Sequence, residues 1–499
     1  MAATILGFNK QALLYSFILF CYTTSYAITY YGVLPQRVIH FTCLEQQHRN
    51  ATLTCDSTLV AELSTKRIAY LNIAYSGASF LTNGPLSRYA DLTSNRKRIL
   101  LWIIFGLTFD QISQVFTTSY LQLVVCHALA GLMGNLYVTL ALLFSFIADA
   151  SSQPSSAAAT TSASDVQAQR RKDYGLAEGS IYIGIMVGPF LGGTIFKLTH
   201  SYMVPYGCSG GLSILLFAVV FFVQPNDTTT AVLMQDALLL HPGGHDESPH
   251  ARLHDVVVEA VTEEDAEEDS NRPQTHTMPW WNPFAPFVLL FGNKSRLMWS
   301  SVLLLAWMGQ KGIDFLYNPF VHYEYNRGAF LIGIIATTKA VSSVVSNICC
   351  MRIFSRLKMR GETVLLIGCV MLILAYSLIG LSSTHSQPSL YFWIGVSMSG
   401  LAAFVSPMIR SLITGTVNKT TELNVNPVTL LGSIAAIESF CDLVVPFIYG
   451  FGLFDWLISI HRASFIFLLG AVFYFLAGLT IVVCGKRRGG GEGGGGGGR

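Results

Sequence analysis

Residues 173–194 read DYGLAEGSIYIGIMVGPFLGGT and form the most informative segment of the chain. One carboxylate, Glu178, stands at the start of an apolar run that also contains Pro189. Glycines four residues apart share one helix face, so a neighbouring helix can approach backbone to backbone, as in lipid bilayers. The proline removes one backbone hydrogen bond and can bend the helix. The segment therefore predicts a closely packed transmembrane helix. The glycines of its packing motif are Gly184, Gly188, Gly192 and Gly193.

The composition of the chain is typical of a membrane protein. Of its 499 residues, 52% are hydrophobic and only 12% are charged, whereas roughly 25% of the residues of soluble domains are charged. The apolar residues form blocks of about 20, the length that crosses a hydrocarbon core as a helix. No phosphate-binding Gly-x-x-x-x-Gly-Lys loop occurs, and no nucleophile stands at motif spacing from a base. We therefore expect a protein that is not an enzyme, with no cofactor, no metal site and no nucleic-acid partner.

Twelve apolar blocks predict an all-α membrane protein with twelve transmembrane helices in two pseudo-symmetric six-helix bundles. We expect an N-terminal bundle within residues 1–223 and a C-terminal bundle within residues 280–485. The basic loop at 352–360 occupies the place in the second half that residues 88–98 occupy in the first, which indicates an internal repeat. The predicted helices lie near residues 13–34, 68–86, 99–117, 121–148, 173–194, 208–223, 297–315, 328–353, 363–381, 390–410, 428–450 and 465–484.

Residues 224–279, between the two halves, have a different composition. They are rich in Asp and Glu, and Arg252 and Arg272 are their only Lys or Arg residues. Such a stretch cannot bury enough apolar surface to offset the entropy lost on ordering, so we expect a disordered tether. Its five histidines suggest a metal site, but without a fixed scaffold a solvated linker is the better interpretation. We also expect disorder in the basic, Gly-rich tail, residues 486–499.

The distribution of basic residues predicts the orientation in the membrane. With twelve spans, both termini, the acidic tether and every strongly basic loop fall on one side, which the positive-inside rule assigns to the cytoplasm. The glycosylation sequon at Asn50 then falls on the opposite side. A disulfide between Cys43 and Cys55 is sterically possible there if the compartment is oxidising. Both the plasma membrane and the lysosomal membrane fit these features.

The glycine spacing around Pro189 resembles the fifth-helix motif of the major facilitator superfamily of transporters. Residues 84–100, GPLSRYADLTSNRKRIL, resemble the superfamily's loop between helices two and three, G-x-x-x-D-R-x-G-R-R. Ser87 replaces the aspartate of that motif, and Asp91 could take its role as a conformational latch through a shifted backbone. The alternative is that the loop is only a positive-inside anchor. The matching residues are Gly84, Arg88, Arg96, Lys97 and Arg98.

Three shorter segments resemble the proton-coupled folate transporter-like family of solute carriers. They are RRKDYGLAEGSI followed by GPFLGG at 170–193, SPMIRSL at 406–412 and AAIES at 435–439. The resemblance implies that Glu178 takes part in proton coupling and that Asp149 lies near the cytoplasmic gate. It also implies that Arg410 affects the handling of substrate and protons. For Glu178, a purely structural role is the alternative.

Several other ionisable residues lie inside apolar blocks, where they are costly and usually face a cavity or a partner. His127 fits either a packing histidine or a proton relay. Fixed cations could hold an anionic substrate, but each could instead be locked to a buried carboxylate. Lys311 and Asp314, three residues apart, could pair locally. The candidate cations are Lys311, Lys339 and Arg410, and the candidate carboxylates are Asp314, Glu438 and Asp442.

These features predict a secondary transporter that works by alternating access, in which two six-helix halves rock about a central site. Proton-coupled symport of a small organic solute, with an anion as one option, fits best, because a carboxylate in an apolar cavity can load and release protons. A proton-coupled drug antiporter and a receptor or scaffold of the same shape that moves no solute are the alternatives. Opposite responses to a pH gradient separate symport from antiport, and an absence of flux indicates a scaffold.

Overall fold

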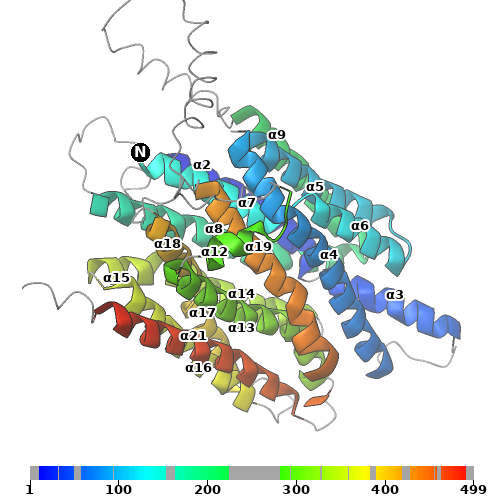
Figure 1. The fold of residues 1–499 in the computed structure, drawn as a ribbon. Helices are drawn as coiled ribbons and strands as arrows, with labels where there is room; N and C mark the ends of the chain where they lie inside the picture. The colour runs from blue at the N-terminus through cyan, green and yellow to red at the C-terminus, as the bar shows by residue number, and fades with distance from the viewer. Residues whose placement is uncertain are drawn as a thin grey trace, which may run out of the picture.

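A computed structural model describes residues 10–31, 33–49, 58–93, 95–152, 163–223, 281–292, 294–325, 329–357, 359–382, 389–417, 427–453, 456–457 and 462–489. The regular structure of these residues is helical throughout, with no strand among them (Figure 1). The helices run roughly parallel to one axis, and α2 begins at the same end of the bundle at which α21 ends. We refer to this end as the terminal end. The acidic segment 224–279 lies outside the described residues, so its role as a tether stays a prediction.

The N-terminal half contains eight of the described helices, which form six spans. Two pairs of helices, α2 with α3 and α6 with α7, follow one another directly. The bounds are α2 (Lys10–Tyr30), α3 (Val33–Arg49), α4 (Thr58–Leu92), α5 (Arg96–Phe116), α6 (Tyr120–Leu132), α7 (Leu136–Ser152), α8 (Ala163–Thr199) and α9 (Met203–Val223).

The C-terminal half forms the other six spans and begins with the short helix α12. Its bounds are α12 (Ala285–Phe291), α13 (Lys294–Tyr325), α14 (Ala329–Val345), η1 (Ser346–Cys350), α15 (Met351–Arg356), α16 (Gly361–Leu381), α17 (Leu390–Leu401), α18 (Val405–Val417), α19 (Pro427–Val445), η2 (Pro446–Leu453), η3 (Ala463–Phe465) and α21 (Ile466–Gly489).

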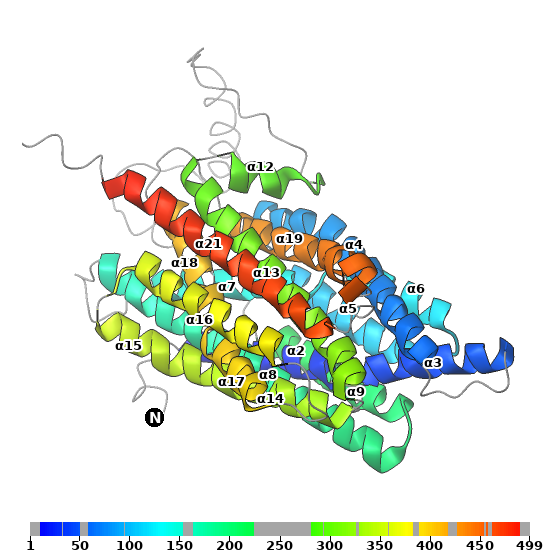
Figure 2. The same cartoon turned by 90° about the horizontal axis from the view of Figure 1, so that it is seen from below.

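Ten helical stretches of the described part are long and apolar enough to cross a membrane. The other two of the twelve spans are α4 and α13, with 35 and 32 residues, which pack among the other helices (Figure 2). Polar side chains lower the hydropathy of both: Asn72 and Asn83 in α4, and Lys311 and Asp314 in α13. Polar groups at membrane depth usually face a cavity or a protein partner rather than lipid. We therefore expect the polar side chains of these two spans to face a cavity or a protein partner.

Two predicted helices are interrupted. Residues 133–135 separate α6 from α7, and residues 402–404 separate α17 from α18. Gly134 has φ +105°, a backbone conformation that glycine adopts without a Cβ penalty. The spans predicted near 121–148 and 390–410 are confirmed as candidate membrane spans, but each contains a break that was not predicted. Each break lies in the fourth span of its half, so the two interruptions occupy corresponding positions of the repeat.

Two segments that lie mostly outside the predicted helices are helical. Val33–Arg49 forms α3, which begins with Pro35 in its first turn, where a missing backbone N–H costs nothing. Helix α4 continues past Pro85 to Leu92, beyond the predicted end near residue 86, so Arg88 and Asp91 of the loop motif lie in a helix. The basic cluster then opens α5 directly.

Helix α8 packs tightly against α2 through its glycines. A Cβ added to Gly188 would lie 2.5 Å from the Ala27 Cβ, and one added to Gly184 would lie 3.0 Å from the Phe20 carbonyl oxygen. Gly192 approaches the backbone of Ile28 in the same way, whereas a Cβ on Gly193 would meet no atom of the described residues within 4 Å. The absence of side chains at three positions therefore permits the close approach of two helix backbones.

The two halves meet along α4 with α19 and along α8 with α14. Large apolar side chains such as Phe116, Leu198 and Phe222 are exposed on the outside of the bundle. Polar and charged side chains such as Glu178, Arg410 and Glu438 are buried inside it. This inverted arrangement suits a protein whose solvent is lipid.

Candidate functional site

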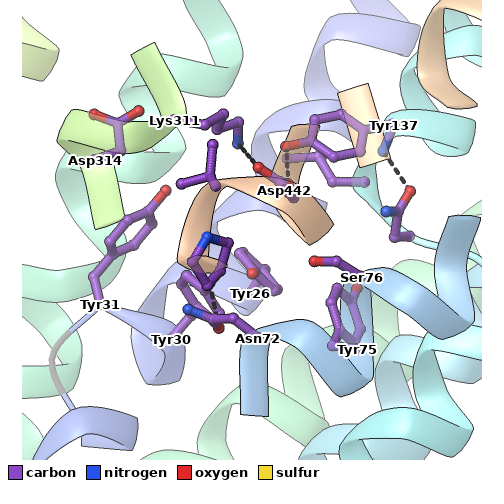
Figure 3. Close-up of a pocket in the computed structure, with 14 residues that line it drawn as sticks. Tyr26, Tyr30, Tyr31, Asn72, Tyr75, Ser76, Tyr137, Lys311, Asp314 and Asp442 are labelled. Atoms are coloured by element: carbon purple, nitrogen blue, oxygen red, sulfur yellow. Dashed lines mark hydrogen bonds and ion pairs between the residues drawn. The ribbon is translucent and has the colours of Figure 1, made fainter. Parts of the chain in front are cut away.

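Two adjoining cavities, of about 110 Å³ and about 140 Å³, lie between the halves. They share five lining residues: Tyr31, Leu136, Tyr137, Lys311 and Asp314. Their walls come from α2, α4, α7 and α8 of the first half and from α13, α14, α18 and α19 of the second. A molecule in this space would therefore contact both halves at once. Figure 3 shows the smaller cavity, where tyrosines from α2 and α4 face Lys311 and Asp442 across the opening.

The most buried charges of the site form a three-residue cluster around Arg410, which we call the Arg410 triad. Arg410 of α18 donates through Nη2 to Glu438 Oε1 of α19 over 2.6 Å. Through Nη1 it donates to Glu178 of α8. All three residues are at most 4% exposed. One guanidinium thus serves two carboxylates that belong to different halves.

The electrostatic state of the Arg410 triad depends on one proton. With both carboxylates ionised, the triad carries one negative charge in excess, and uncompensated charge is costly away from water. A single proton removes this excess. The guanidinium also lies 5.4 Å from the Phe144 ring centroid and 6.0 Å from that of Trp307, a cation–π arrangement that contributes to its placement.

Two lysines line the central space, and each is held by a carboxylate. Lys311 Nζ lies 3.5 Å from Asp442 Oδ1, and the Tyr137 hydroxyl donates to Asp442 Oδ2 over 2.5 Å (Figure 3). Lys339 of α14 donates to Asp314 of α13. Lys311 and Asp314 thus each have a partner elsewhere, and the local pair suggested by their spacing is not the arrangement found. The lysines remain in the cavity wall, where an anion could compete for them.

A ladder of small polar contacts joins α4 to α19, running from the cavity toward the terminal end. Asn83 donates to Ser439 Oγ over 2.5 Å and to Asn135 Oδ1 over 3.1 Å. Further along, the Thr429 hydroxyl donates to the Asp91 carboxylate. Asp91 therefore bridges the halves, which is the geometry that a latch residue requires.

The glycine and the basic cluster of the predicted loop motif lie at the same end. A Cβ on Gly84 would lie 2.7 Å from Pro286 Cγ of α12. Arg96 donates to Asp149 over 2.5 Å, and the Asp149 side chain is 52% exposed. Asp149 is therefore a surface residue outside the central cavities. Arg88 and Lys97 are half-buried, and Arg98 is exposed.

His127 also lies outside the two central cavities. Its ring is buried in the N-terminal half, with Nδ1 3.0 Å from Asp110 Oδ1.

Sequence reasoning missed two kinds of residue in this region. Asp110 was not predicted as a candidate, although it is an acidic residue inside an apolar helix, the same signal that identified the other candidates. The tyrosines of the cavity wall were also missed. Tyr26 and Tyr30 are four residues apart in α2, so they share a helix face, and this spacing could have revealed them.

The predicted glycosylation and disulfide residues lie in and after α3. Cys43 is buried and disulfide-bonded. Asn50 and Cys55 lie outside the described residues, so the pairing of Cys43 with Cys55 and the use of the sequon stay predictions. Within the part of the chain that the structure describes, no group of three or more His, Cys, Asp or Glu side chains could hold a metal ion.

Comparisons with known proteins match this architecture. A family model described as the Major Facilitator Superfamily matches residues 14–424. The human organic anion transporter MFSD10 (TETRAN) superposes with a TM-score of 0.63 at 12% identity, over 95% of this chain and 99% of that one. The proton:xylose symporter XylE, bound to 6-bromo-6-deoxy-D-glucose, gives 0.63 at 13% identity, over 95% and 94%. No curated protein matches by sequence, and at these identities the two structures show a common fold alone. The chain belongs to the major facilitator superfamily, whose members are membrane transporters.

Proposed function

We propose that this protein is a secondary active transporter that carries a small organic anion across the membrane together with protons, by alternating access. The observation that carries the proposal is the sharing of one buried guanidinium by two carboxylates from different halves, Glu178 and Glu438. Coupling needs a group whose protonation alters the contact between the halves, and Glu178 meets that need.

The coupling step follows from the charges of the Arg410 triad. When Glu178 is ionised, its ion pair with Arg410 holds α8 against α18. When Glu178 takes up a proton, Arg410 keeps Glu438 as its partner, and the link between the halves weakens. Ion pairs away from water are strong when both partners are charged, so the change is large enough to alter the relative stability of two arrangements of the halves.

The lysines supply the binding chemistry for an anion. Lys311 and Lys339 line the cavity, together with Trp307, Tyr137 and Tyr317. An anionic group can displace a carboxylate from a lysine most easily when that carboxylate has accepted a proton. Proton and anion then enter as a neutral pair, which avoids placing net charge inside the membrane. The aromatic rings offer flat apolar surfaces for the rest of the solute.

The two structural neighbours are consistent with this chemistry. One is named as an organic anion transporter and the other as a proton:xylose symporter. Each name describes the activity of that neighbour and not of this chain. Because the fold is shared, a screen should begin with organic anions as solutes and with proton symport as the mode of coupling.

The test is uptake into proteoliposomes with an imposed pH gradient and a panel of labelled folates, other organic anions and hydrophobic drugs. We expect an organic anion to accumulate when the outside is acidic and not when the gradient is reversed. Lys311→Met and Lys339→Met should raise the KM for that anion. Accumulation only with an acidic interior would indicate a drug antiporter, and an absence of flux for every compound would favour a scaffold. Either result would contradict the proposal.

A further inference from the structure

A second cluster of ionisable side chains lies in the N-terminal half, apart from the Arg410 triad. Asp110 of α5 and His127 of α6 are 5% and 3% exposed. His127 Nδ1 lies 3.0 Å from Asp110 Oδ1, and Gln114 Nε2 donates to the same oxygen over 3.2 Å. His127 Nε2 is buried and has no hydrogen-bond partner among the described residues. Since buried polar atoms are normally paired, this nitrogen calls for an explanation.

The pair lies directly behind the wall of the central cavity. A small cavity of about 10 Å³, close to the size that holds one water molecule, is lined by Asp110 and His127 and by Tyr26 and Tyr30. The same two tyrosines line the central cavity. Tyr75, which also lines it, stacks on the His127 ring with 4.5 Å between the ring centroids. One layer of aromatic rings therefore separates the pair from the space proposed for the solute.

The pair is closer to the end of the bundle opposite the terminal end. Asp110 lies in the last third of α5, and His127 lies early in the span that α6 and α7 form together, so both are nearer to the turn that joins α5 to α6. The positive-inside rule predicts that this is the outer side of the membrane. Protons from the outer compartment would therefore reach His127 more directly than they would reach the Arg410 triad.

Asp110 is the natural counter-ion for a protonated His127. A further charged group on this side of the half is Arg37 of α3, whose guanidinium donates to the carbonyl oxygens of Gln114 and Thr117 over 2.5 and 2.6 Å. It also lies 5.2 Å from the Tyr206 ring centroid. Arg37 is thus held by the C-terminal end of α5. The other titratable groups that face the pair are Tyr22, Tyr26 and Tyr30 of α2, Tyr75 of α4 and Tyr206 of α9.

We propose that Asp110 and His127 form a second proton-binding site, which strengthens the binding of an anionic solute in the central cavity when the outer side is acidic. A proton from the outer solution adds to Nε2 of the neutral imidazole, while Nδ1 keeps its hydrogen bond to Asp110. The added positive charge lies one aromatic layer from the cavity, where the low dielectric screens it little. This inference rests on the proposed function, because it assigns a role to the pair in anion binding.

The transport test separates affinity from rate. For an anion found by the uptake screen, we expect its KM to fall by about fivefold or more on acidification of the outside, the low end of usual coupling between two sites. His127→Gln keeps a donor for Asp110 but cannot be charged, so its KM should fall less on acidification, by only the part that protonation of the cavity carboxylates supplies. In Asp110→Asn, the same fall in KM should require a more acidic solution, because the counter-ion of the protonated His127 is lost. The exposed His40→Gln is the matched control and should behave as the unmodified protein. An equal loss of uptake by His127→Gln at all pH values, with the KM response intact, would overturn the proposal.

A second measurement detects the proton without transport. In detergent-solubilised protein labelled with ¹⁵N-histidine, the signal that disappears in His127→Gln should change on acidification, as expected for an imidazole that takes up a proton. The titration should move in Asp110→Asn. A His127 signal that stays constant would overturn this proposal whatever the transport result. A signal that titrates in a protein without any flux would leave the proton site standing and contradict the proposed function instead.

Discussion

Arg410 of α18 and Glu178 of α8 form a buried ion pair that joins the two halves of the molecule. The same guanidinium is bound by Glu438, so it stays paired whatever the charge of Glu178. Removal of one partner from a buried pair typically costs about 3–5 kcal/mol, because the other charge is left uncompensated. Neutralisation of Glu178 therefore costs less free energy than removal of Arg410, because Arg410 keeps Glu438 as a partner.

Replacement of Arg410 tests this asymmetry. Arg410→Ala leaves Glu178 and Glu438 facing each other without a cation, so we expect a loss of about 3–5 kcal/mol of stability. Arg410→Lys should recover only part of it, because an ammonium cannot serve two carboxylates with the fork of a guanidinium. Thermal unfolding of the detergent-solubilised protein measures both, with the exposed Arg98→Ala as control. An Arg410→Ala protein that unfolds at the unmodified temperature would show that the ion pairs are unimportant.

Two adjacent glycines of α8 offer a matched pair of variants. A Cβ at Gly192 would meet the backbone of Ile28, whereas one at Gly193 would meet nothing within 4 Å in the part of the chain that the structure describes. Overpacking of this kind costs about 1–3 kcal/mol, so Gly192→Val should lower the yield of monodisperse protein and its unfolding temperature. Gly193→Val should change neither by much. Equal effects of the two variants would mean that α2 and α8 do not pack as described.

Asp314→Asn tests how Lys339 is released. The neutral amide no longer neutralises the ammonium, so Lys339 becomes available to an anionic solute without a proton on residue 314. We expect the affinity for the transported anion at neutral pH to rise by about tenfold, which corresponds to about 1.4 kcal/mol. Asp149→Asn changes an exposed carboxylate outside the cavity and should leave this affinity unchanged. A lower affinity in Asp314→Asn would show that Asp314 binds the solute rather than restraining the lysine.

The sequon at Asn50 tests the predicted orientation. If residue 50 faces the outer or luminal side, glycosidase treatment should increase the electrophoretic mobility of protein expressed in eukaryotic cells. Asn50→Gln should have the mobility of the treated protein without treatment. The basic residues Lys486–Arg488 predict the opposite side for the C-terminus, so an epitope placed there should be accessible only after permeabilisation. An epitope that is accessible on intact cells would reverse the topology.

Much of the fold follows from patterns that are local in the sequence. The length of the apolar blocks predicts the spans, and the glycine spacing in α8 predicts a face for close packing. Interruptions of a helix are harder to predict. Gly134 is the signal for the break between α6 and α7, but glycine is also common in uninterrupted transmembrane helices. The break at 402–404, Ala-Ala-Phe, contains no glycine or proline, and its signal is Pro407 in the first turn of α18, although proline also occurs inside transmembrane helices that continue, such as Pro189 in α8.

The partners of the buried charges depend on tertiary packing. Spacing alone suggests that Lys311 pairs with Asp314, but the bundle brings Asp442 to Lys311 and Lys339 to Asp314. Each of these contacts joins different helices. The sequence therefore identifies which charges are buried, whereas the choice among several carboxylates requires the positions of α13, α14 and α19 in space. His127 shows the same limit, because its partner, Asp110, lies on another helix.

The most direct test of proton coupling through Glu178 compares two transport assays of Glu178→Gln in proteoliposomes. Gln cannot be charged, so the variant resembles the protonated state and its link to Arg410 is weak at every pH. We predict that it exchanges labelled for unlabelled anion across the membrane at a rate close to that of the unmodified protein. We also predict that it loses accumulation driven by a pH gradient, with the larger loss at neutral pH and the smaller at acidic pH. Equal losses of exchange and accumulation at both pH values would show that Glu178 has only a structural role and would contradict the account.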